Sequence, residues 1–261
     1  MPITPKRHFD EDISRAESLV LNARSLPSTT DAERLVRDDV LRSGWMFAVG
    51  AMDAYFCDAY VHCLTTTLRA KSIQPSVILP AFVKNIRIPI GSILSAYANR
   101  PNWKWRMATR DMMERDNILQ LEKVTKLFNP FFPDGQNKKL FGEVIDVWIQ
   151  APHATAHLFG ITGAQFAALP VGQAKDRGRK DALKYFTSRI GTIIQRRHDC
   201  IHNCDRPKNT PQPIGNHGSV RNVIRDVRFL VDQFDAHINT EFLDFLTRIG
   251  CTAVTRNGLG Y

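Results

Sequence analysis

The chain lacks any hydrophobic run of the roughly 20 residues that a helix needs to cross a bilayer. Its most apolar segment, residues 45–56, is shorter and carries a carboxylate at Asp53. The first twelve residues are polar and charged, unlike a secretory leader. We therefore expect a cytoplasmic protein without a membrane partner.

Cysteine is also scarce, and its count of five is odd, which argues against a disulfide framework and for a reducing compartment. The sequence contains no P-loop, no Rossmann glycine pattern, no Gly-x-Ser-x-Gly and no His-Glu-x-x-His. These absences argue against the enzyme classes that depend on those motifs, and we expect no cofactor.

No series of strand patterns and no internal repeat occurs, whereas apolar residues recur at helical spacing over most of the chain. We predict an all-α fold, a helical bundle formed by residues 1–261 as a single domain. Its core is expected to contain an early helix from a capping box at Thr30–Glu33 to about residue 68, and two late helices over 176–203 and 220–249. Residues 75–150, interrupted by prolines, are expected to form an inserted helical lobe.

Shorter segments are less regular. We expect helices over residues 9–25, 88–98, 109–128 and 139–150, a connector over 159–173 and a frayed end over 251–261.

The net charge of the chain is +9, and its distribution is uneven. Residues 175–208 contain ten Lys or Arg against four Asp or Glu, so this one segment supplies +6 of that total. A concentrated basic segment suits the phosphate backbone of a nucleic acid.

Within that segment, residues 196–206 hold two imidazoles, two thiols, two carboxylates, an amide and three guanidiniums. Arg197 is followed after four residues by His202, with a polar residue, His198, directly after the arginine. The pattern falls at the predicted end of the basic helix. An imidazole titrates near neutral pH and can transfer a proton, and a guanidinium can hold two phosphate oxygens.

This pattern resembles the signature of the HEPN superfamily, a helical group rich in ribonucleases, in which Arg is followed by four to six residues and then His. The stretch around Asp53 is similar to the first core helix of that family, where an acidic residue lies between small and aromatic ones. The likeness covers about residues 30–70 and 175–248, and it is nearest to the prokaryotic toxin and antiphage branch, similar to RiboL-PSP-HEPN domains.

The resemblance implies a metal-independent endoribonuclease that leaves a 2′,3′-cyclic phosphate and a 5′-hydroxyl. It also implies a homodimer with the two motifs facing one another, an RNA substrate, and an antitoxin or other regulatory protein as a further partner. A non-catalytic helical module that binds RNA or protein is the alternative.

For the cleavage reaction we assign His202 to proton transfer, Arg197 to the phosphate, and Asp199, three residues before His202, to orienting that histidine. The supporting residues are expected to be His198, Asn203, Arg196 as an alternative to Arg197, and Asp53 as a partner for Arg197. Contacts to the RNA backbone are expected from Arg189, Arg206 and Lys208.

Helix geometry sets one condition on this assignment. Residues five apart, such as Arg197 and His202, point about 140° apart on a regular helix. They can therefore act together only through the long arginine side chain, a local break in the helix, or a dimer.

Two other readings of the sequence remain open. His198 with His202 and Cys200 with Cys204 have the spacing of zinc ligands, but the two pairs lie on nearly opposite helix faces, so we expect no metal. Aromatic and basic residues alternate over 101–106, a pattern that can also stack single-stranded bases.

Overall fold

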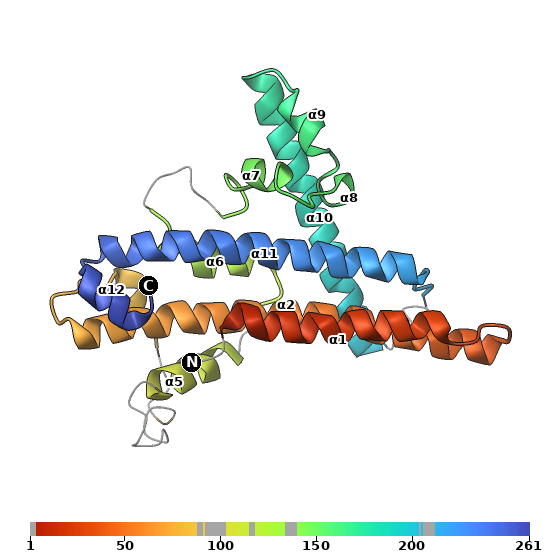
Figure 1. The fold of residues 1–261 in the computed structure, drawn as a ribbon, viewed down its shortest axis with the longest axis horizontal. Helices are drawn as coiled ribbons and strands as arrows, with labels where there is room; N and C mark the ends of the chain where they lie inside the picture. Colours follow the sequence, from red (N-terminus) through yellow and green to blue (C-terminus); the bar gives the residue numbers. More distant parts are fainter. Residues whose placement is uncertain are drawn as a thin grey trace. The chain divides into compact units, whose positions relative to one another are not determined.

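The structure, a computed structural model, describes residues 4–87, 91, 103–114, 118–133, 140–203, 205 and 212–261. Every regular element in these ranges is a helix, so the predicted all-α class is confirmed (Figure 1). No helix in the described ranges is long and apolar enough to cross a membrane. The elements are α1 (Pro5–Ser25), α2 (Asp31–Ile73), α3 (Ala81–Lys84), α5 (Trp103–Glu114), α6 (Leu121–Phe128), the 3₁₀ helix η1 (Asn129–Phe131), α7 (Ile145–Ile149), α8 (Ala156–Phe159), α9 (Gly163–Ala167), α10 (Gln173–Asn203), α11 (His217–Arg248) and α12 (Ala253–Leu259).

The chain divides into two compact units. The first contains residues 1–55 and 141–234, and the second contains residues 56–140 and 235–261. Two of the three boundaries fall inside a long helix, at residues 55/56 in α2 and at residues 234/235 in α11. The expectation of a single domain with an inserted lobe stays a prediction.

Local capping signals explain where α1 and α2 begin. The Thr4 hydroxyl accepts a hydrogen bond from the backbone N–H of Arg7, and Pro5 occupies the first turn, so α1 starts before the expected residue 9. The predicted capping box is present: the backbone N–H of Glu33 donates to the Thr30 hydroxyl at 3.2 Å, and the Glu33 carboxylate accepts from the Thr30 N–H at 2.9 Å.

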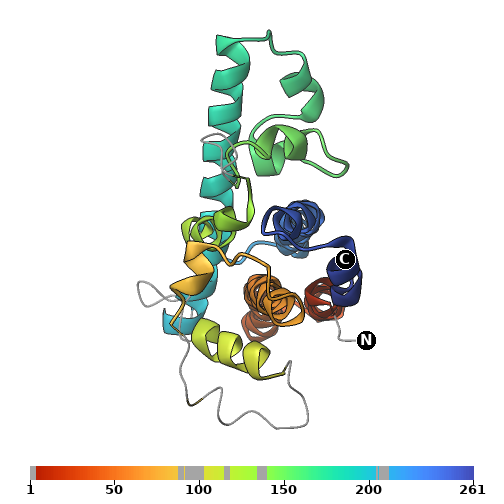
Figure 2. The same cartoon turned by 90° about the vertical axis from the view of Figure 1, so that its left-hand side faces the viewer.

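In the first unit, α1 lies alongside the first part of α2 (Figures 1 and 2). The approach is close at Gly44, where an added Cβ would lie 2.9 Å from a methyl carbon of Val20. Helix α10 joins this pair through Trp45, whose indole N–H donates to the carbonyl of Ile193 at 3.0 Å. These contacts place the end of α10 against α2.

The first half of α10 is covered by the short helices α7 and α8. Phe186 on α10 stacks on Phe159 of α8 at 5.5 Å between ring centroids, and Trp148 of α7 packs edge-on against the same ring. Arg179 is held at this end by Asp146, at 2.6 Å. The expected connector over 159–173 includes a further short helix, α9.

The second unit is built on aromatic residues around Phe131 of η1. Its ring lies 5.1 Å from Phe245 and 5.5 Å from Phe242, both on α11. Residues 109–128, expected as one helix, belong to α5 and α6, with residues 118–120 outside any helix. The end of the chain is also ordered, because Thr252 caps α12 and the Tyr261 hydroxyl lies 2.7 Å from the His62 ring.

Two further helix predictions are affected by the structure. Helix α7 begins at Ile145, after a series of turns, so the helix expected over 139–150 is shorter than predicted. The helix expected over 88–98 lies outside the described residues, apart from residue 91.

Candidate functional site

Helix α10 continues through the motif without interruption and ends at Asn203. Arg197 and His202 therefore lie on different faces of a regular helix, about 140° apart. The local break that could have brought them together within one chain is absent from residues 173–203. Their cooperation then depends on side-chain reach or on a second copy of the chain.

Arg197 faces a groove of about 370 Å³ that is formed by α1, α2 and α10. Phe47 and Ile201 in this groove are 40% and 49% exposed, which is high for large apolar side chains. The guanidinium of Arg15 lies 5.0 Å from the centre of the Phe47 ring, as in a cation–π contact. The full lining is Asp12, Arg15, Ser43, Met46, Phe47, Gly50, Ala51, Arg197 and Ile201.

Asp53 on α2 lies half-buried near this groove. Burial raises the pKa of its carboxyl group above the ordinary value, while the positive charges of Arg197 and His198 act in the opposite direction and lower it. The structure therefore brings Asp53 within electrostatic range of two residues of the motif. This is the proximity that the family resemblance implied for Asp53 and Arg197.

His198 and His202 lie on the adjacent face of α10. Their rings are stacked, with centroids 6.0 Å apart and planes inclined by 15°. His198 is half-buried and His202 is exposed. His198 thus lies within electrostatic range of Asp53, and its ring stacks on the exposed imidazole of His202.

Asp199 has a different partner from the one expected. Its carboxylate accepts a hydrogen bond from the Gln195 side chain at 3.0 Å, and its backbone carbonyl accepts one from the N–H of Asp205. The hydrogen bond from Gln195 occupies one carboxylate oxygen, and a role for Asp199 in orienting His202 stays a prediction. Asn203 is the last residue of the helix, and its side chain lies outside the described part of the structure.

Arg196, the expected alternative to Arg197, is part of a buried ionic cluster. Asp205 is fully buried, and its carboxylate accepts hydrogen bonds from Arg196 at 2.6 Å and from Arg42 of α2 at 2.7 Å. Arg196 also donates to the carbonyl of Gln212 at 3.1 Å. The Arg196 guanidinium thus anchors the end of α10 to α2 and to the segment before α11, and it is not presented to a ligand.

Sequence reasoning missed Arg42 and Asp205. Asp205 belongs to the motif segment, but nothing in the sequence indicates a partner 163 residues away. Its backbone has a φ of 59°, a left-handed conformation that Asp adopts more readily than most residues. This turn directs the chain back against α10, where the N–H of Gln212 donates to the Asp205 carbonyl at 2.8 Å.

Arg189, expected to contact RNA, is paired inside the first unit. Its guanidinium donates to the buried carboxylate of Asp226 on α11 at 2.9 Å, and His157 lies 3.3 Å from the same carboxylate. Burial raises the pKa of Asp226, and the charges of Arg189 and His157 partly offset this rise. The guanidinium of Arg189 thus neutralises a buried acid, and a contact with RNA stays a prediction.

Several residues that the sequence analysis names lie outside the part of the chain that the structure describes. Arg206, Lys208 and Cys204 lie outside the described residues, as do the first two residues of the aromatic and basic stretch 101–106. Among the described residues, no group of three or more His, Cys, Asp or Glu is arranged to hold a metal ion.

Comparison of the chain with protein-family models, with curated proteins and with solved structures finds no match. The likeness to the HEPN superfamily therefore rests on the motif residues themselves, and it stays a prediction.

Proposed function

We propose that the protein is a metal-independent endoribonuclease whose active site is formed at the end of α10. The observation that supports this most is the placement of Asp53 within electrostatic range of Arg197 and His198, with the exposed ring of His202 stacked on that of His198 and the Arg197 guanidinium lining an open groove. Proton transfer and stabilisation of a charged phosphate are the two requirements of RNA cleavage without a metal.

In the proposed reaction, the 2′-oxygen of a ribose attacks the adjacent phosphorus, and the bond from phosphorus to the 5′-oxygen breaks. The proton of the 2′-hydroxyl passes to a base, and another proton passes to the departing 5′-oxygen. His202 performs one of these transfers, because its exposed ring can reach a bound strand. Arg197 holds the non-bridging oxygens, on which negative charge accumulates in the transition state.

Asp53 and His198 act as positioning residues in this proposal. Asp53 attracts the Arg197 guanidinium and limits where it can point, and the ring of His198 supports the ring of His202. Gln195 holds one oxygen of the Asp199 carboxylate, which leaves the other oxygen to assist His202.

A homodimer satisfies the geometric condition without relying on the reach of the Arg197 side chain. Two copies of α10 that face one another would place Arg197 of one copy beside His202 of the other. The exposed side chains of Phe47 and Ile201, next to Arg197, offer apolar area that such an interface could bury.

The resemblance suggests that this activity serves as a toxin or an antiphage effector, held in check by an antitoxin or regulatory protein. The same exposed apolar side chains favour one alternative, a non-catalytic module that docks RNA or protein through this groove.

Incubation of the protein with single-stranded RNA in EDTA tests the proposal. We expect cleavage by the wild type, with 2′,3′-cyclic phosphate ends, and a loss of at least about 100-fold in rate for His202→Asn. His153→Asn is the matched control, because His153 is exposed and its φ of 68° is one that asparagine tolerates.

Equal cleavage by wild type and His202→Asn would contradict the role of His202. Loss of wild-type cleavage in EDTA would indicate a metal-dependent reaction. Salt-sensitive RNA binding without cleavage would favour the alternative of a binding module.

A further inference from the structure

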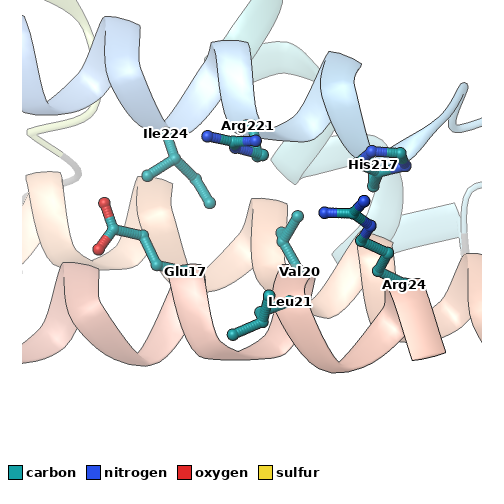
Figure 3. Close-up of a pocket in the computed structure, with 7 residues that line it drawn as sticks. All are labelled: Glu17, Val20, Leu21, Arg24, His217, Arg221 and Ile224. Atoms are coloured by element: carbon teal, nitrogen blue, oxygen red, sulfur yellow. The ribbon is translucent and has the colours of Figure 1, made fainter.

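A second groove lies in the first unit between α1 and α11, and no residue of the motif lines it (Figure 3). It has a volume of about 320 Å³, at the lower end of the range for small-molecule sites. Buried Val20 and Ile224 form its apolar floor, and Leu21, which is 67% exposed, adds an apolar side. The remaining lining residues are Glu17, Arg24, His217 and Arg221.

The charges in this groove are separated along its length. Arg24 and His217 lie at one end, Arg221 lies near the middle, and Glu17 lies at the other end (Figure 3). Glu17 is already paired with Arg228, at 2.9 Å. Within the part of the chain that the structure describes, no carboxylate forms an ion pair with Arg24, His217 or Arg221.

The placement of two of these groups is unfavourable for the free protein. His217 is the first residue of α11 and Arg221 follows one turn later, with no acidic residue in that first turn. The N-terminal end of a helix carries partial positive charge and attracts anions, so basic side chains gain nothing from it. Arg24 lies in the last turn of α1, where a cation is favourable, and this position accounts for Arg24 alone.

All three side chains are exposed, and a bound anion would supply the ion-pair partner that they lack. We propose that this groove binds a phosphate monoester carried on a small aromatic group, of the kind found in a nucleoside monophosphate. The guanidiniums of Arg24 and Arg221 bind the phosphate oxygens, with His217 and the first turn of α11 beside them. The aromatic group lies on Val20, Leu21 and Ile224.

This site is independent of the proposed ribonuclease. None of its lining residues belongs to the motif or to the groove at Arg197. Ligand binding here can therefore be measured whether or not the protein cleaves RNA, and failure of one proposal leaves the other standing.

Isothermal titration calorimetry with adenosine monophosphate tests the proposal, with adenosine and inorganic phosphate titrated separately. Arg24→Gln and Arg221→Gln each remove one guanidinium from the groove. Arg225→Gln is the matched control, because Arg225 is exposed on the same helix, donates to Asn222 at 2.6 Å and does not line the groove. Circular dichroism checks that all the variants are folded.

We expect adenosine monophosphate to bind the wild type more tightly than adenosine or phosphate. Each groove variant should weaken this binding about tenfold or more, as expected when one charge-assisted contact is lost, and Arg225→Gln should leave it within about twofold. Leu21→Ser should weaken binding of the nucleotide and leave binding of inorganic phosphate unchanged. No binding to the wild type, equal binding of adenosine, or equal losses for Arg221→Gln and Arg225→Gln would overturn the proposal.

Discussion

At the scale of single residues, two carboxylates near the end of α10 are compensated in different ways. Asp205 is fully buried, and one of its oxygens accepts hydrogen bonds from both Arg42 and Arg196. Asp53 is half-buried, and burial dominates the shift of its pKa despite the charges of Arg197 and His198. The first carboxylate anchors the end of α10 to α2, and the second belongs to the proposed site.

Asp205→Asn should destabilise the protein by about 3 kcal/mol, because it removes the buried carboxylate from two guanidiniums with side-chain exposures of 9% and 14%, and leaves Arg42 only the more exposed Asp39. Asparagine tolerates the left-handed backbone at this position, so the substitution tests the charge. Urea unfolding measures the change. Asp31→Asn, which removes an exposed carboxylate paired with Arg34, is the control and should remain close to the wild type. Equal effects of the two substitutions would contradict the anchoring role of Asp205.

The raised pKa of Asp53 predicts that the stability of the folded protein depends on pH. Because its pKa is raised in the folded state, the favourable contribution of its protonated form is present below its unfolded pKa of about 4 and is lost as the pH rises through the folded value. Asp53→Asn should therefore gain stability over the wild type as the pH increases through this window. Thermal unfolding of both proteins from pH 3.5 to 7 measures the difference, and a gain that shrinks with rising pH would contradict the prediction.

Single residues also decide which parts of the candidate site the sequence alone could predict. Arg197 and His202 could be identified because proton transfer and phosphate binding require particular residue types at a short spacing. Arg196 has the same residue type and nearly the same position, yet it is held by Asp205 and Gln212. That distinction depends on where the chain turns after α10, and a local pattern cannot reveal it.

At the scale of elements, helix α2 contains two glycines in different surroundings. An added methyl group at Gly44 would meet buried, β-branched Val20 at 2.9 Å and the carbonyl of Ala16 at 3.4 Å, whereas nothing lies within 4 Å at Gly50. Gly44 therefore allows the close packing of α1 on α2, while Gly50 carries only the low helix propensity of glycine.

Gly44→Ala should destabilise the protein by about 1–3 kcal/mol through overpacking. Gly50→Ala should stabilise it by about 0.5–1 kcal/mol, because alanine has the higher helix propensity. Urea unfolding of the two variants in parallel should show changes in the free energy of unfolding of opposite sign. Stabilisation by both substitutions would show that α1 and α2 are not packed as closely at Gly44 as described.

The long helices could be predicted because their apolar periodicity extends over many turns and Thr30 and Glu33 mark a boundary. The shorter elements could not. Residues 109–128 read as one pattern although residues 118–120 separate α5 from α6. The sequence predicts a frayed end for the chain because the residues that order this end are distant in the sequence. Tyr261 contacts His62 and Phe242.

At the scale of the whole molecule, the proposed activity depends on a second copy of the chain. Helix α10 is regular through Asn203, so Arg197 and His202 lie on different faces of it. If the active site is shared, each site takes its arginine from one subunit and its histidine from the other. An inactive Arg197→Gln subunit can then complement an inactive His202→Asn subunit.

The most direct test mixes these two variants under conditions that exchange subunits and measures RNA cleavage in EDTA. Half of the dimers are then mixed, and each mixed dimer has one of its two sites intact, so we expect about a quarter of the wild-type rate. Each variant taken alone through the same exchange should remain inactive. A mixture as inactive as its components, or a wild type that does not cleave RNA, would contradict the account.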